Sequence, residues 1–486
     1  MLRNPVSIGG HPDLHKMLAE DLESLRLIVD GLRRLETKAM ETLSAVDACN
    51  RGYFTPAEED SVMRLVFAFR SYRLGLYEII QHYLAYEQVA DAELRLRAFS
   101  TGYAAALFLY GKSFTMLHVA ETRPILRRKL NEENRDGAMS AGFLDEVVDS
   151  YSSVFHQRLL RRAQRFWHSQ RTLMHSLRAS DPDWRWLSTV IRRQRGIVRR
   201  AFKRVVHWRI RHDWKALWRM VFKPIGTMSG GLGMLFAGRV ARKRPSNKAV
   251  HAIDAALLNQ LSPLLQPGDI LLIRAEGKLT TSLLPGFWAH AAIYVGGAGD
   301  VERLGMSAHP LVKTRWPALR DNEPQWGWVI EAVSPKVTIH PLDYSLRADH
   351  VAVLRAQLDS VELHAVLDEA CSHLGKPYDF KFDFNISSRI VCTELIYRAF
   401  HGRAKITFDL VKRLGRYSLC SDDIARQATR AHEGGGGPME LVALAVRDGA
   451  SRMNLLESVH AVRGMELILD GLRPTAVRDF ARRASR

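Results

Sequence analysis

The sequence has few cysteines and no long hydrophobic run, and each shortage excludes a class of protein. Its four cysteines stand at positions 49, 371, 392 and 420 of 486 residues. They form no CxxC pair, so we expect neither a disulfide framework nor a structural metal site. No uninterrupted apolar run approaches the roughly 20 residues that a membrane-spanning helix requires. The opening residues, MLRNPVSIGGHPDLHK, contain no apolar stretch and do not predict a secretory signal. These absences favour a cytoplasmic protein that can touch a membrane surface but does not cross one.

Several common catalytic motifs are also missing. The sequence contains no dinucleotide-binding GxGxxG, no phosphate-binding loop, no HExxH zinc motif and no GxSxG nucleophile turn. We therefore expect no cofactor and no metal ligands. Acidic residues are fewer than basic ones, at 52 Asp and Glu against 70 Lys and Arg, which leaves a formal charge of +18. An excess of positive charge favours a partner that carries phosphates, either anionic lipid or nucleic acid.

The length and the patterning predict an α+β protein with several parts. Hydrophobic residues make up 47% of the chain, which is enough for real cores. Helical spacing of apolar residues predicts a helical bundle over residues 1–190. A basic amphipathic helix and a glycine-rich linker are expected over 191–260. Short β-rich runs between residues 268 and 356 then predict strands of a mixed domain over 261–430, and a C-terminal helical segment is expected over 438–486.

The basic segment has three interpretations. Between Arg192 and Lys223, twelve Lys or Arg stand against a single acid, and apolar residues recur every three or four positions. A helix with one basic and one aromatic face is typical of segments that lie on a membrane surface. Trp214, Trp218 and Phe222 are therefore candidate membrane contacts. A bundle helix with a solvated basic face explains the same pattern. Nucleic acid is the least favoured partner, because bases need stacking aromatics on an accessible face.

One cysteine stands where a nucleophile is expected. Cys392 opens a predicted helix over 392–401, where unpaired backbone N–H groups and the helix dipole favour a thiolate. His290 opens a predicted strand and is a candidate base. Glu331 interrupts an apolar strand and needs a buried partner, which a histidine can supply. These three residues can form a Cys, His, Glu arrangement. Each also has a structural explanation, since buried cysteines at helix starts and histidines at strand ends are common.

The order of the segments resembles the circularly permuted NlpC-type papain-like thiol hydrolases, in particular their YiiX-like branch. The resemblance covers about residues 262–425, and its motifs are PGDILLIR, WAHAAIYVG, VIEAVSPKVTIHPL, HVAVLR, GKPYDFKFDF and CTELIYRAF. In that family the nucleophilic cysteine follows the histidine, as Cys392 follows His290 here. The resemblance implies a papain-like domain in which an antiparallel sheet packs on helices. It also implies that Cys392 is the nucleophile, His290 the general base and Glu331 the third member.

The sequence allows more than one role for several further residues. Tyr378, in GKPYDF, is a candidate oxyanion or substrate contact, and a packing role is as good an explanation. His340 and Glu302 are alternatives for the third member. Glu394 has a structural reason at a helix start, and Cys371 and Cys420 are expected to be structural.

Two functions of different classes follow from these residues. The first is a cysteine-dependent hydrolase or acyltransferase that acts on an amide or ester bond through a covalent acyl-enzyme, on a lipid or peptide-like substrate at a membrane surface. The second is a non-enzymatic, membrane-associated scaffold or binding protein. The presence of both Cys392 and His290 argues against the scaffold, because a purely binding domain does not need that pair. The sequence does not predict the oligomeric state.

Overall fold

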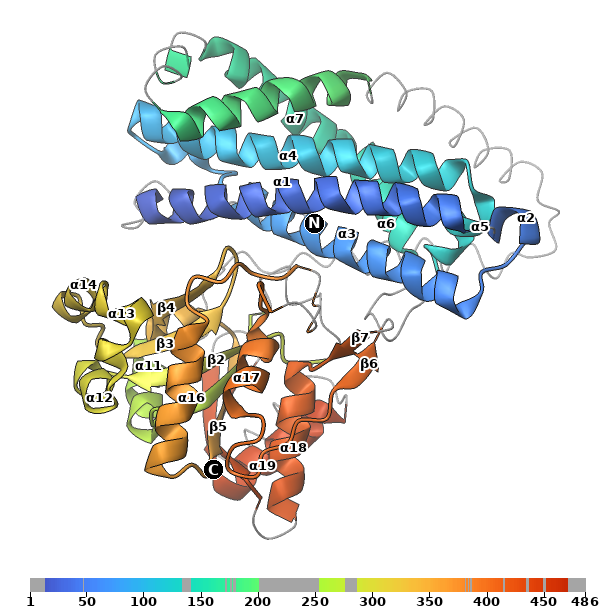
Figure 1. Ribbon diagram of the computed structural model, residues 1–486. Helices are drawn as coiled ribbons and strands as arrows, with labels where there is room; N and C mark the ends of the chain where they lie inside the picture. Colours follow the sequence, from blue (N-terminus) through green and yellow to red (C-terminus); the bar gives the residue numbers. More distant parts are fainter. Residues whose placement is uncertain are drawn as a thin grey trace. The chain divides into compact units, whose positions relative to one another are not determined.

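The structure is a computed structural model whose described residues fall into two compact units (Figure 1). The first unit includes Ile79–Asn131 and the described residues from Gly142 to 200, and the second includes Ala19–Glu78 and the described residues from 253 onward. The described residues are 14–46, 48–132, 141–170, 173–174, 177, 181–200, 253–275, 286–380, 382, 384, 387–413, 416–433, 437–448 and 452–470.

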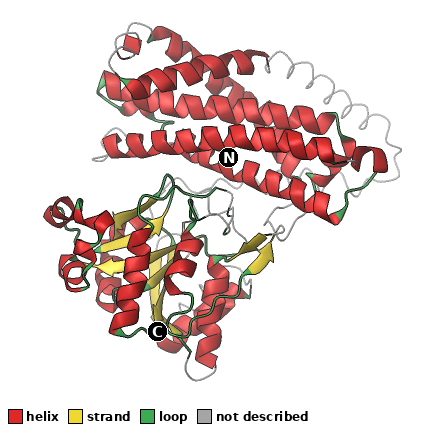
Figure 2. Ribbon diagram, viewed as in Figure 1, coloured by secondary structure: helices red, strands yellow, loops and turns green. Residues whose placement is uncertain are grey.

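Long helices make up the chain before residue 200, as the apolar spacing predicts (Figure 2). They are α1 (Leu14–Ala45), α3 (Pro56–His82), α4 (Ala92–Glu121), α6 (Phe143–Ser152), α7 (Val154–Ser169) and a helix over 182–200. Local capping explains two of the starts. The backbone N–H of Thr55 donates to Glu58 at 2.8 Å before α3, and Asp91 accepts from the N–H of Leu94 before α4. Such caps satisfy backbone donors that the first helical turn leaves unpaired.

The second unit contains a seven-stranded sheet with the order β4-β3-β2-β1-β5-β8-β9, in which every neighbouring pair is antiparallel. Its strands are β1 (Ile270–Arg274), β2 (His290–Gly296), β3 (Trp328–Ala332), β4 (Val337–Pro341), β5 (His350–Ala356), β8 (Met439–Asp448) and β9 (Arg452–Glu457). The strands that the sequence predicts between residues 268 and 356 therefore form, and the α+β class is confirmed.

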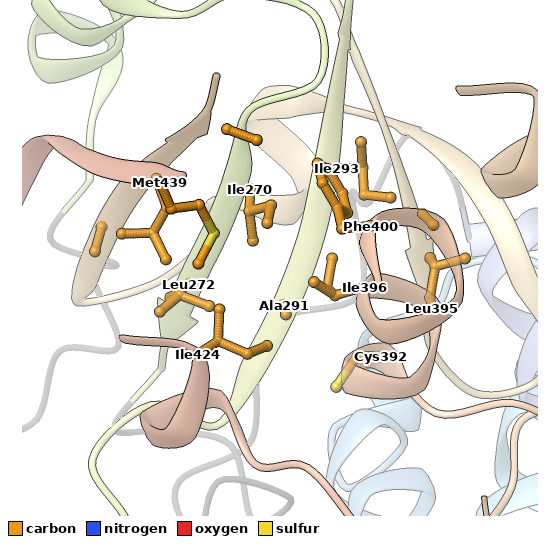
Figure 3. Close-up of a cluster of buried hydrophobic side chains, with 14 of the residues drawn as sticks. Ile270, Leu272, Ala291, Ile293, Cys392, Leu395, Ile396, Phe400, Ile424 and Met439 are labelled. Atoms are coloured by element: carbon orange, nitrogen blue, oxygen red, sulfur yellow. The ribbon is translucent and has the colours of Figure 1, made fainter. Parts of the chain in front are cut away.

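Both faces of the sheet are covered, because side chains alternate between the faces along each strand. On one face, Ile270 and Leu272 of β1 belong to a core with residues of four helices. These helices are α16 (Ser360–Ser372), α17 (Cys392–Phe400), α18 (Ser421–Glu433) and α19 (Ser458–Leu469). On the other face, Leu271 and Ile273 pack with α11 (Ala255–Leu261). Figure 3 shows side chains of α17 directed toward Ala291 and Ile293 of β2. This packing fixes α17 against the centre of the sheet.

The prediction that residues 438–486 form a helical segment is wrong for its first part. Residues 439–448 and 452–457 form β8 and β9, and only α19 is helical. Ala443 and Ala445 lie in the core on one face, and Leu444 and Val446 lie in the core on the other. A strand that is buried on both faces has no polar alternation, so its apolar run cannot be distinguished from a buried helix by periodicity alone.

Candidate active site

Cys392 is the first residue of α17, and its side chain is buried, with an exposure of 1%. The residue before it, Val391, is extended, so the helix starts abruptly at the cysteine. Leu395, Ile396 and Phe400 are fully buried on the helix face that packs on the sheet (Figure 3). The apolar face thus anchors the helix, and its first turn presents unpaired backbone N–H groups beside the thiol.

His290 lies between Cys392 and Glu331. It is the first residue of β2, and its Nε2 is 2.6 Å from Oε2 of Glu331. Burial by itself lowers the pKa of His290, but the negative charge of Cys392 and the hydrogen bonds to Cys392 and Glu331 outweigh it and raise that pKa to about 10. Because Nε2 is engaged by Glu331, Nδ1 is the nitrogen that can face the sulfur. The arrangement places an imidazolium beside the sulfur of Cys392.

Glu331 is a buried carboxylate that accepts from three side chains. Its exposure is 3%, and besides His290 it contacts Nδ1 of His340 at 2.7 Å and Oγ of Ser345 at 2.6 Å. Burial tends to raise the pKa of Glu331, but the hydrogen bonds with the two histidines hold it well below its ordinary value. Glu331 is therefore an ionised acceptor inside the protein.

The sheet register explains why these residues meet. Ala292 of β2 pairs with Glu331 of β3, so His290, two residues earlier, points to the same face as Glu331. His340 of β4 pairs with Val329, two residues before Glu331, and it lies on that face as a diagonal neighbour. Three adjacent strands therefore supply the two histidines and the acid.

An acid that the sequence analysis missed holds the start of β2. The carboxylate of Asp422, in α18, accepts from the backbone N–H groups of Phe287 at 2.9 Å and Trp288 at 2.8 Å. The indole N–H of Trp288 donates to the sulfur of Met465, in α19, at 3.2 Å. These contacts fix the residues before His290. No local pattern indicates them, because the partners are more than 130 residues apart in the chain.

The other candidates occupy different positions. Burial and the charge of Cys392 raise the pKa of Tyr378 well above its ordinary value, so its hydroxyl stays protonated near the sulfur and can donate. Glu302 is exposed and pairs with Arg320 at 3.5 Å, outside the group around Cys392. Glu394 is buried, accepts from Arg398 at 2.6 Å, and has a pKa that burial raises to about 7.

Cys371 and Cys420 lack the surroundings of Cys392. Cys371 and Cys420 are free and buried. Burial is the main cause that raises the pKa of each to about 12. Both thiols are therefore protonated and poorly nucleophilic near neutral pH. Within the described part of the chain, no group of three or more His, Cys, Asp or Glu side chains could hold a metal ion.

Most of the basic segment lies outside the described residues. Trp214, Trp218 and Phe222 are among the residues that are not described. Residues 192–200 continue the helix that starts at 182, and Val198, on its predicted apolar face, is buried. None of the described helices is both long enough and apolar enough to span a bilayer.

The segment that carries these residues is similar to a known protein family. Residues 264–447 match the family described as permuted papain-like amidase enzyme, YaeF/YiiX, C92 family. A solved structure described as metalloprotein yiiX, from Escherichia coli O157:H7, is similar at 17% identity over 40% of this chain and 98% of that chain, with a TM-score of 0.23. No curated protein matches the sequence. Over residues 264–447 the chain therefore matches the permuted papain-like amidase family, and this match supports a papain-like hydrolase.

Proposed function

We propose that Cys392, His290 and Glu331 cleave an amide or ester bond through a covalent acyl-enzyme. The Cys392 thiolate attacks the carbonyl carbon, and the carbonyl electron pair moves to the oxygen. When this intermediate collapses, the bond to the leaving group breaks and His290 gives the Nδ1 proton to the leaving nitrogen or oxygen. The acyl group is then a thioester on Cys392.

The second half of the reaction regenerates the thiolate. His290, now neutral, takes a proton from water as the water oxygen attacks the thioester, and the sulfur leaves as a thiolate next to the imidazolium. An amine or hydroxyl acceptor in place of water gives acyl transfer. Glu331 stays ionised and orients the ring through Nε2. The backbone N–H groups at the start of α17 and the hydroxyl of Tyr378 are available to the developing oxyanion.

The observation that carries the proposal is the contact of His290 with a buried carboxylate on one side and a helix-start cysteine on the other. A thiol-reactive acyl probe, followed by peptide mapping, tests it. We expect the acyl group on Cys392, and we expect Cys392→Ala to abolish labelling and His290→Ala to slow it about 10²-fold. Cys371→Ala is the matched control and should label as wild type does. Equal labelling of Cys371 or Cys420 would contradict the proposal.

The substrate is proposed as a lipid or a peptide-like acyl amide at an anionic membrane surface in the cytoplasm. Four arginines of the helix over 182–200 support the membrane part, because Arg192, Arg193, Arg199 and Arg200 are all exposed. Basic residues near an anionic bilayer contribute about 1 kcal/mol each. The buried Val198 supports the alternative that the segment packs as a bundle helix at its start.

Vesicle co-sedimentation separates these alternatives. The intact protein should bind anionic vesicles, with affinity that falls steeply as salt rises. The Trp214→Ala, Trp218→Ala double variant should lose that binding while it remains folded. If the wild-type protein does not bind anionic vesicles at physiological salt, the membrane part of the proposal is excluded. The proposed chemistry at Cys392 is not affected by that result.

A further inference from the structure

A second histidine contacts Glu331 on the oxygen that His290 does not use. Oε2 of Glu331 is bonded to His290, whereas Oε1 accepts from His340 at 2.7 Å and from Ser345 at 2.6 Å. His340 comes from β4, and Ser345 comes from α15 (Leu342–Ser345). The carboxylate is therefore held on one oxygen by two donors and offers the other oxygen to the catalytic ring.

The contacts of His340 do not suggest a purely packing role. Its exposure is 3%, and its ring lies 4.5 Å from that of Tyr344, centroid to centroid. Its Nε2 is buried and has no hydrogen-bond partner among the described residues. A buried polar atom without a partner costs about 1 to 3 kcal/mol, so an apolar side chain would fill this space at a lower cost. The hydrogen bond from Nδ1 to Glu331 is the contribution that only a donor can make.

We propose that His340 is a positioning residue, which with Ser345 fixes the rotation of the Glu331 carboxylate so that Oε2 is presented to His290. The inference rests on the proposed function, since it assigns a role to the acid of that site. His340 acts through Glu331 and His290. The same two donors stabilise the ionised carboxylate in a site that would otherwise favour its protonated form.

The charged and titratable groups around Glu331 define what a pH experiment would report. They are His290 of β2, His340 of β4 and Tyr344 of α15. The charges of Glu20 and Asp21 of α1 and of Arg347 act in turn on Tyr344, and Arg347 lies over its ring. Cys392 joins this group through His290. If the His340 donor is removed, Glu331 should protonate at a higher pH, and the imidazolium should then lose the anion that supports it. As pH falls, the alkylation rate of Cys392 should consequently decline at a higher pH than in wild type.

The test is the pH profile of iodoacetamide alkylation at Cys392 in the full chain, read by peptide mapping. His340→Leu should move the acidic limb to higher pH by about one unit, which is about a tenfold slower rate at a given pH on that limb. His340→Asn keeps a donor near the position of Nδ1 and should restore most of the wild-type profile. Ser345→Ala removes the other donor and should move the limb in the same direction by less.

Each outcome decides the inference. A folded His340→Leu protein with the wild-type alkylation profile would contradict the positioning role of His340. Equal shifts in His340→Leu and His340→Asn would also contradict it, because the shape of the ring, and not its hydrogen bond, would then be what matters. If His340→Leu does not fold, an unchanged profile in Ser345→Ala overturns it instead. Failure of the proposed function looks different, because the wild-type protein would itself show the profile of an ordinary thiol.

Discussion

At the scale of single residues, the positive charge of His290 beside Cys392 has the most direct consequence for reactivity. The pKa of His290 is raised to about 10, so its protonated form persists across the neutral range next to the sulfur. This cation stabilises negative charge on the sulfur of Cys392. A protonated histidine beside the sulfur is therefore the property that distinguishes this cysteine from Cys371 and Cys420.

We expect Cys392 in wild type to be alkylated faster than Cys371 and Cys420 at about pH 6.5, because the protonated His290 ring stabilises negative charge on its sulfur. His290→Ala should lower the rate at Cys392 at this pH by about 10²-fold, because it removes that cation. Stopped-flow alkylation with peptide mapping measures these rates. Identical rates at Cys392 in the two proteins would mean that His290 does not activate the sulfur.

Glu394 links the same region to the pH dependence of stability. Burial raises the pKa of this carboxyl from about 4.5 to about 7. Between these values the folded protein binds more protons than the unfolded chain, so the free energy of unfolding falls as pH rises through this window. A shift of this size corresponds to a loss on the order of 3 kcal/mol at most.

Glu394→Gln should remove this loss. The difference in unfolding free energy between variant and wild type should move in favour of the variant from about pH 4.5 to about pH 7. Urea unfolding at several pH values measures it, with exposed Glu302→Gln as the control. A constant difference across the window would show that Glu394 ionises normally. The bond with Arg398 belongs to the same balance, because it lowers the pKa that burial raises, and the variant removes both effects together.

At the scale of elements, the connection between α18 and the start of β2 determines where His290 stands. Asp422 accepts two backbone N–H groups that the sheet does not pair. Gly286, just before them, has φ +114°, and a Cβ at this position would clash with the Asp422 carboxylate. The loop therefore needs both the acid and the absence of a side chain at Gly286.

We expect Asp422→Ala to lower the free energy of unfolding by about 2 kcal/mol or more, because it leaves a buried and a partly buried backbone donor without their acceptor. Alkylation of Cys392 should slow in the protein that remains folded, since His290 follows these residues directly. Asp422→Asn keeps one acceptor and should lie between wild type and Asp422→Ala. Urea unfolding, followed by the fluorescence of Trp288 and the other tryptophans, measures the loss. An Asp422→Ala protein as stable as wild type would show that water replaces the acid.

At the scale of the whole second unit, the C-terminal strands are part of the sheet. β8 lies between β5 and β9, and it pairs with β5 from His350↔Val446 to Ala356↔Met439. The family match extends to residue 447, so it includes nearly all of β8 but not β9 or α19. The sheet of this protein therefore extends beyond the matched segment.

Substitutions near the end of the chain test whether these strands stabilise the unit. Leu444→Asp places a charge at a fully buried position of β8 and should cost about 3 kcal/mol or more, because the carboxylate gains no partner there. Val459→Asp, at a position that is 65% exposed, is the control and should stay within about 0.5 kcal/mol of wild type. Equal losses in both proteins, or none in either, would contradict the sheet order.

The sequence alone determined the features that depend on chain neighbours. Apolar spacing identified the N-terminal helices and the strands from 268 to 356, and the segment order identified the papain-like family, which the comparison confirmed. Cys392 was recognised because a helix start leaves donors unpaired within a few residues of the thiol.

Only the tertiary structure decided which distant side chains meet and which ambiguous run is a strand. Asp422 reaches Phe287, and His340 and Ser345 reach Glu331, because sheet order and helix packing place them together. Residues 439–448 form β8 because they pair with the edge of β5 and both faces of the strand are buried. Local periodicity gives no information about such partners, because they are distant in the sequence and are brought together only by the rest of the sheet.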